Sequence, residues 1–199
     1  MKIHWLAAVA SILVVSSSQD LDAALIQVGT GTDTSYFVIE SPNIGVREYA
    51  ISYTYDPIND PLGGTDLLDL IAAEDSSISF DILNFGTVSQ PNEFLSSITF
   101  NGVTETNDFS PGGTTWAQWL AGGQAGAENS SPFAPAPVPL DDDSWTFGSG
   151  LSVNYRLVEP GSSDALVFGT GEPSTAPIPE PSSLLLGLGT SLILLRRRR

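Results

Sequence analysis

"TSYFVIESPNIGVREYAISYTY", residues 34–55, is the stretch whose pattern indicates the fold class. Apolar and aromatic residues recur at every second position in 34–40 and again in 46–55, and turn residues bound both runs. Period two is typical of a half-buried β-strand, and Tyr, Phe, Ile and Val suit a pleated surface. Residues 76–85 and 94–103 repeat the pattern. The chain therefore contains at least four predicted strands.

One short helix is predicted between the second and third of these strands. Residues 55–64, YDPINDPLGG, form a turn cluster, and TDLLDLIAAED follows at 65–75. Thr65 or Asp66 is the expected N-cap. Apolar residues then recur at helical spacing: Leu67, Leu68, Leu70 and Ile71. With closing strands expected at 153–158 and 165–168, the prediction is an α+β fold, a strand-rich small single domain with one short helix. An all-β sandwich is the alternative.

The charge distribution excludes nucleic acid as a partner. Residues 25–178 contain twenty acidic residues against Arg47 and Arg156, a formal charge of −18, whereas the whole chain carries −16. Binding to a phosphate backbone needs cations that displace its counterions. The acidic surplus could recruit divalent cations or keep an exported protein soluble, and solubility is the favoured interpretation.

The amino-acid composition excludes most common kinds of catalytic site. The chain has no cysteine, and its only histidine is His4, inside the N-terminal segment. Ser-His-Asp and Cys-His centres and imidazole zinc sites are therefore excluded, and no metal or cofactor is predicted. Carboxylate pairs remain, but no spacing selects one. Asp141 to Asp143 lack the D-x-D-x-D-G spacing of a calcium loop, so we expect a solvated acidic loop there, after a Pro-rich connector at 132–139.

The N-terminus has the pattern of a secretory signal peptide. Lys2 precedes an apolar run at 6–15, and serines follow at 16–18. The run is too short to span a bilayer, which needs about 20 residues. We expect residues 1–24 to be a signal peptide, cut near Ser16 to Ser18 or after Ala24, and residues 25–171 to form the exported domain.

The C-terminus predicts a membrane segment. A Pro-rich spacer at 172–181 leads into the uncharged residues 182–195, and four arginines close the chain at 196–199. Fourteen residues make about 21 Å of helix against a hydrocarbon core of about 30 Å, so the segment is thin. Arginines favour the cytoplasmic side, which makes this end a stop-transfer signal behind a translocated domain.

These C-terminal features resemble the PEP-CTERM sorting signal of Gram-negative bacteria. The motif is Pro179, Glu180 and Pro181, followed by the apolar run, which is shorter than usual in that family, and by Arg196, Arg197, Arg198 and Arg199. In that family an exosortase, a membrane-embedded protease or transpeptidase, recognises and removes the signal in organisms that make exopolysaccharide. The resemblance implies exosortase as a partner, exopolysaccharide as a neighbour, and the arginines as a cytoplasmic stop. It also implies a single-pass precursor in the cell envelope that ends at the cell surface or in the extracellular matrix.

The body is similar to the transcobalamin-like C-terminal domains in the order of its short motifs. Those are a T-x-L-x-x-L helix, a strand ending in I-x-x-G-V, a W-x-x-W pair and a late strand. The counterparts here are Thr65, Leu67, Leu70, residues 98–103, Trp116, Trp119 and residues 167–169, where the expected tryptophan is missing. The similarity implies an α+β domain with a small sheet. It implies no cobalamin site, because no ligand-contacting residue matches.

Trp116 and Trp119 are the candidate ligand-binding residues of the body. They are three apart in TTWAQWLAGG, and on a helix they would share a face. Exposed, they could stack on sugar rings or another small molecule; buried, they belong to the core, which is the more usual fate of large aromatics. The leading interpretation is an exported, non-enzymatic surface or matrix protein. The alternatives are a carbohydrate- or small-molecule-binding module and a carboxylate-dependent hydrolase.

Overall fold

The computed structural model describes residues 25–87, 92–125 and 138–177. The predicted signal peptide, the motif at 179–181, the apolar run at 182–195 and the terminal arginines lie outside the described residues. Among the residues that are described, no helix is long and apolar enough to cross a membrane.

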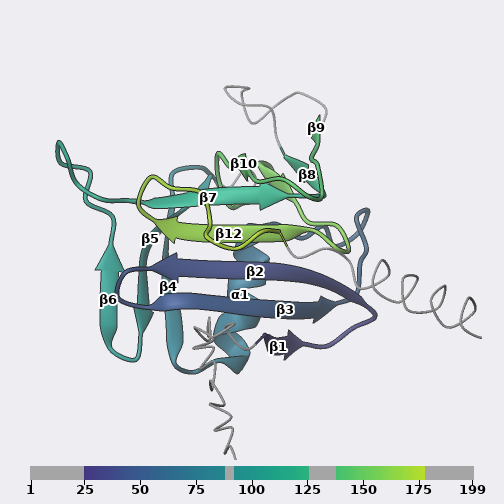
Figure 1. Cartoon of the computed structure of the whole chain (residues 1–199). Helices are drawn as coiled ribbons and strands as arrows, with labels where there is room; N and C mark the ends of the chain where they lie inside the picture. The colour runs from purple at the N-terminus through teal and green to yellow at the C-terminus, as the bar shows by residue number, and fades with distance from the viewer. Residues whose placement is uncertain (1–24, 88–91, 126–137, 178–199) are drawn as a thin grey trace, which may run out of the picture.

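A six-stranded sheet forms the front layer of the domain (Figure 1). Its strands, in spatial order, are β1 (Ile26–Gly29), β3 (Gly45–Tyr53), β2 (Asp33–Ser41), β12 (Ser163–Phe168), β7 (Trp116–Ala121) and β10 (Thr146–Phe147). Strands β2 and β3 form the antiparallel hairpin expected from the opening stretch. Strand β12 pairs in parallel with β2 and antiparallel with β7, so it joins the two ends of the described chain.

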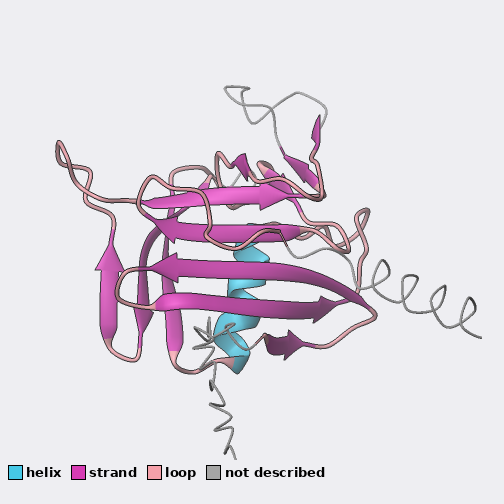
Figure 2. Ribbon diagram, in the orientation of Figure 1, coloured by secondary structure: helices cyan, strands magenta, loops and turns pink. Residues whose placement is uncertain are grey.

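Behind this sheet lie the helix α1 (Gly64–Glu74) and a second sheet, made of β4 (Ile78–Asn84), β5 (Glu93–Phe100) and β6 (Val103–Thr106) (Figure 2). A third, small sheet combines β11 (Arg156–Leu157), β8 (Gln124–Ala125) and β9 (Val138–Pro139). The predicted α+β class, strand-rich with a short helix, is confirmed.

The hydrophobic core fills the space between the front sheet and the layer behind it. Phe37 and Ile39 of β2 lie on the same face as Ile51 of β3, and all three are fully buried. Leu68 and Ile71 of α1 pack against this face, because residues three and four apart share one side of a helix. Because successive side chains of a strand point to opposite faces of the sheet, one set of apolar residues in β2 and β3 lies in the core.

Three details differ from the sequence expectations. The helix begins at Gly64 with Gly63 as its N-cap, where a Cβ would lie 2.5 Å from the backbone nitrogen of Val153. Asp66 caps from inside the helix by accepting a hydrogen bond of 2.7 Å from the Gly63 N–H. The predicted strand 94–103 is broken by Asn101 and Gly102, whose positive φ angles of 48° and 82° make the β5–β6 turn. The predicted strand 153–158 forms only the two residues of β11.

The segment after β12, residues 169–177, folds back over the outer face of the front sheet, and we call it the C-terminal strap (Figure 1). The Ser174 N–H donates to the Glu40 carboxylate over 2.7 Å, and the Trp145 indole N–H donates to the Thr175 carbonyl over 2.8 Å. Pro173 and Pro177 are buried. The described part of the predicted spacer, 172–177, is therefore packed on the domain.

Candidate functional site

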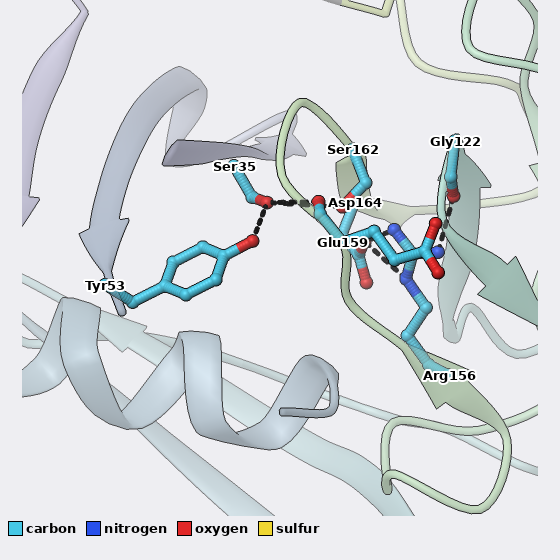
Figure 3. Close-up of polar contacts among 7 residues, drawn as sticks. All are labelled: Ser35, Tyr53, Gly122, Arg156, Glu159, Ser162 and Asp164. Atoms are coloured by element: carbon cyan, nitrogen blue, oxygen red, sulfur yellow. Dashed lines mark hydrogen bonds and ion pairs between the residues drawn. The ribbon is translucent and has the colours of Figure 1, made fainter. Parts of the chain in front are cut away.

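A buried ion pair lies beneath β12 (Figure 3). Arg156 Nε donates to Asp164 Oδ1 over 2.8 Å, the second guanidinium nitrogen lies 2.5 Å from the same oxygen, and a third donates to the Gly122 carbonyl over 2.6 Å. Both side chains are almost fully withdrawn from solvent. Burial raises the pKa of Asp164, and the Arg156 guanidinium opposes that rise. A charge at this depth needs its partner, so the pair is structural.

A hydroxyl cluster continues from the ion pair toward β3 (Figure 3). The Ser35 hydroxyl lies 2.8 Å from the Tyr53 hydroxyl and 3.2 Å from that of Ser162, and it donates to the Glu159 carbonyl over 2.9 Å. Ser35 is fully buried and has no imidazole or amine beside it among these contacts. Burial raises the pKa of Tyr53 to about 12, against the opposing effect of the Ser35 hydrogen bond. The cluster therefore ties β2 and β3 to the turn before β12.

An apolar cleft of about 430 Å³ opens between β7 and the second sheet. Large side chains make most of its wall: Phe85, Phe94, Phe109, Phe147, Trp116 and Leu151. Phe85 and Phe109 are 70% and 78% exposed, and Phe147 is 54% exposed. Apolar side chains gathered on a surface around a concavity mark a contact site more often than scattered single ones do.

Each aromatic residue of the cleft is held by its own element. Phe85 follows β4 and makes an edge-on contact with Phe94 of β5 at 5.8 Å between ring centroids. Phe109 lies in the loop after β6, which is closed by a hydrogen bond of 2.9 Å from the Asp108 N–H to the Thr114 carbonyl. Trp116 begins β7, and its indole N–H donates to the Glu105 carbonyl over 3.1 Å. The rings thus project from two sheets and two loops into one space.

Most polar groups at the floor of the cleft are engaged by the fold, whereas the buried Gln118 Nε2 has no hydrogen-bond partner among the described residues. Gln118 Oε1 accepts from the Gly150 N–H over 3.2 Å, and the Gln118 carbonyl accepts from the Gly148 N–H over 2.9 Å. The Leu151 N–H donates to the Glu93 carbonyl over 3.0 Å. These bonds fix the loop 148–151 as a wall. None of the residues that line the cleft is acidic or basic.

The two candidate tryptophans do not form a common platform. TTWAQWLAGG contributes a strand, β7, instead of a helix, so residues three apart point to opposite faces of the sheet. Trp116 faces the core and the cleft, whereas Trp119 lies on the outer face, where its ring meets Phe147 edge-on at 5.5 Å. Only Trp116 is part of the cleft.

Sequence reasoning missed the phenylalanines that surround Trp116. Phe85 is the last residue of the predicted strand 76–85, and Phe109 lies in the turn sequence Asp-Phe-Ser-Pro-Gly, where no strand or helix pattern assigns it to a core. A large aromatic residue inside a turn cluster was the available signal, because such a residue has little chance of burial.

The acidic residues of the described chain do not form a second binding site comparable to the apolar cleft. Asp141, Asp142 and Asp143 lie exposed, as expected. A more open groove beside α1 contains Asp60, Asp66, Asp69 and Glu74. Burial raises the pKa of Asp66, but its carboxylate is engaged by the Gly63 N–H as a helix cap. In the described part of the chain, no three acidic or histidine side chains lie close enough to hold a metal ion.

Replacing Tyr53 by phenylalanine tests the hydroxyl cluster. At pH 7 we expect Tyr53→Phe to lower the free energy of unfolding by about 1 kcal/mol, because the hydrogen bond with Ser35 is lost. Between pH 10 and about 12 the unfolded wild-type chain ionises this phenol while the folded chain keeps it protonated, so the wild type loses stability that the variant keeps. The stability advantage of the wild type should therefore shrink and then reverse in urea titrations as the pH rises through this range, because a pKa difference of two units is worth about 2.7 kcal/mol, more than the hydrogen bond.

The matched control is Tyr155→Phe, which alters a tyrosine of the loop before β11. A difference between wild type and Tyr53→Phe that stays constant from pH 7 to about 12 would contradict the assignment of a protonated, buried Tyr53.

No family model, no curated protein and no solved structure matches this chain. What can be proposed about its function rests on the C-terminal motif and on the geometry of the cleft.

Proposed function

We propose that this chain is an exported, non-enzymatic protein of the cell surface or exopolysaccharide matrix, sorted through its C-terminus. Pro179, Glu180 and Pro181 are the motif that an exosortase recognises, and Arg196 to Arg199 hold the precursor at the cytoplasmic side until it is cut. The observation that carries this proposal is the order of the signals: a signal-peptide pattern, an acidic body, the motif, an apolar run and a terminal arginine cluster.

The packing of the C-terminal strap supports this role. The strap is bound to the front sheet through Ser174 and Thr175, and Pro177 is buried only two residues before Pro179. A cut at the motif would therefore leave the strap, residues 169–177, on the released domain together with its contacts to the front sheet.

The lining of the apolar cleft suits binding better than acid–base chemistry at that site. General acid–base chemistry needs a titratable group within hydrogen-bond reach of the reacting atoms. The lining residues contain no carboxylate, imidazole or amine, and the buried Ser35 hydroxyl cluster is closed to solvent. These features favour a binding or structural role over the carboxylate-dependent hydrolase.

The intact mass of the protein recovered from the culture medium tests the sorting proposal. In the producing strain we expect a mass that ends near residues 179–181, with any excess reporting an attached molecule. In a strain without its exosortase we expect a mass that includes Arg199. Glu180→Gln in the motif should raise the uncut fraction, whereas the matched control Glu172→Gln in the strap should be cut as the wild type is.

A full-length C-terminus in both strains would contradict the proposal. The chain would then be a membrane-anchored domain in which the motif has no role.

A second candidate, a small-molecule-binding module, is favoured by one observation: the cleft of about 430 Å³ beside Trp116, with its exposed aromatic rim. Ligand pockets are commonly concave, mostly apolar and of about 300 to 1,000 Å³. This candidate adds to the sorting proposal, since an exported matrix domain can carry a binding site.

Trp116 can report on occupation of the cleft. In the secreted protein with Trp119→Phe and Trp145→Phe, Trp116 is the only indole of the folded domain. We expect its emission to change in a saturable way with either exopolysaccharide from the same culture or the neutral aromatic dye N-phenyl-1-naphthylamine. A flat response to both would contradict the module, provided that circular dichroism shows the variant to be folded.

A further inference from the structure

We infer that the cleft takes uncharged, largely apolar molecules and discriminates against anions and sugars. This inference rests on the proposed binding module and names its ligand class. It follows from three properties of the described residues: the shape and lining of the cleft, the placement of the basic residues, and the existing hydrogen bonds of the polar atoms nearby.

The lining selects for apolar surface. The cleft is bounded by rings from five places in the fold, namely the turn after β4, β5, the loop after β6, β7 and β10, and Leu95, Leu151 and Leu166 also line it. All three leucines are at most 5% exposed, so this part of the wall belongs to the packed core. A ligand that lies among the exposed rim rings removes their surface and its own from water, which is favourable only when the ligand surface is apolar too.

Neither basic residue lies where it could pair with an anion bound in the cleft. Among the described residues only Arg47 and Arg156 are basic. Arg156 is buried against Asp164, and Arg47 lies on β3 with its guanidinium carbon 3.8 Å from the centroid of the Phe100 ring. Neither lines the cleft. A carboxylate or sulfonate would enter without a counter-charge and against the field of a body of charge −18.

The Asn107 amide and the Gln118 amide oxygen are engaged by the fold, and the buried Gln118 Nε2 has no hydrogen-bond partner among the described residues. One buried donor cannot serve the many hydroxyls of a sugar, which disfavours sugars. Asn107 Oδ1 accepts from the Trp116 N–H over 2.6 Å, and its Nδ2 donates to the Leu95 carbonyl over 2.6 Å. The Gln118 amide oxygen accepts from the Gly150 N–H, and the Gln118 side chain opposes the rise in the pKa of Asp164 that burial causes. A sugar would stack on the rings, but most of its hydroxyls would lose water without gaining a partner.

A pair of dyes that differ only in charge tests this inference. N-phenyl-1-naphthylamine is neutral, and 1-anilinonaphthalene-8-sulfonate carries a sulfonate on the same ring system. With the secreted protein recovered from culture, we expect saturable fluorescence enhancement with the neutral dye and binding of the sulfonate weaker by about tenfold or more. Oligosaccharides from the exopolysaccharide should not displace the neutral dye.

Rim variants locate the binding site. Phe85→Ser and Phe109→Ser remove exposed rings and should each weaken binding of the neutral dye several-fold without loss of fold, since both side chains are mostly in solvent. Ile58→Ser is the matched control, because Ile58 is 87% exposed and does not line the cleft. Ser149→Trp fills the cleft from its own wall and should abolish binding, whereas Ile58→Trp should leave it unchanged.

The outcomes separate the ligand class from the module itself. If the two dyes bind with equal affinity, and Phe109→Ser abolishes the binding of both, the inferred ligand class would be overturned while the proposal of a binding module would stand. Displacement of the dye by oligosaccharide would do the same. If the affinity for the neutral dye is unchanged in Phe85→Ser, Phe109→Ser and Ser149→Trp, the dye binds outside the cleft and the inference is overturned. Absence of any response from a folded protein to dyes and oligosaccharides would overturn both.

Discussion

The parallel pairing of β12 with β2 is the constraint on which the rest of the structure depends. It joins the β1-β3-β2 portion of the front sheet to the β7-β10 portion, and β7 carries Trp116 and the floor of the cleft. The same pairing places Asp164 opposite Phe37, on the buried face, where a lone carboxylate would be very costly. Arg156 compensates for it, and loss of one partner from such a pair costs about 3 to 5 kcal/mol.

The two faces of the front sheet have different roles. The inner face packs on α1 and the second sheet, and the cleft lies where this packing ends beside β7. The outer face carries small residues, including Ala50, Ala117 and Ala165, and it is the face to which Glu40 binds the strap. The cleft and the attachment of the strap at Glu40 therefore use different parts of the front sheet.

Local patterns predicted the local elements well. The period of two in 34–40 and 46–55 gave β2 and β3, and the spacing of Leu67, Leu68 and Ile71 gave α1, because these patterns reflect which face of each element is buried. Which distant strands pair with one another cannot be predicted from such local patterns. Strands β2 and β12 lie more than a hundred residues apart, and nothing in either sequence names the other as its partner.

The candidate site was predictable only in part. Trp116 was identified as a candidate, but its assumed companion Trp119 lies on the other face, because the segment is a strand with a period of two. The rim phenylalanines come together only through the arrangement of β4, β5, β10 and the loop after β6. An ion pair of Arg156 could have been expected from the composition, because Arg156 is one of two basic residues in a body that contains twenty acidic residues. Which acid it would meet depended on the β12–β2 pairing.

A crystal structure of the secreted domain with N-phenyl-1-naphthylamine would show whether the cleft beside Trp116 is the binding site of this domain. We expect ordered density for the dye between the Phe85 and Phe109 rings and the Trp116 indole, with the strap still in place on the outer face. Density for the dye on the outer face beside Trp119, with an empty cleft, would contradict it.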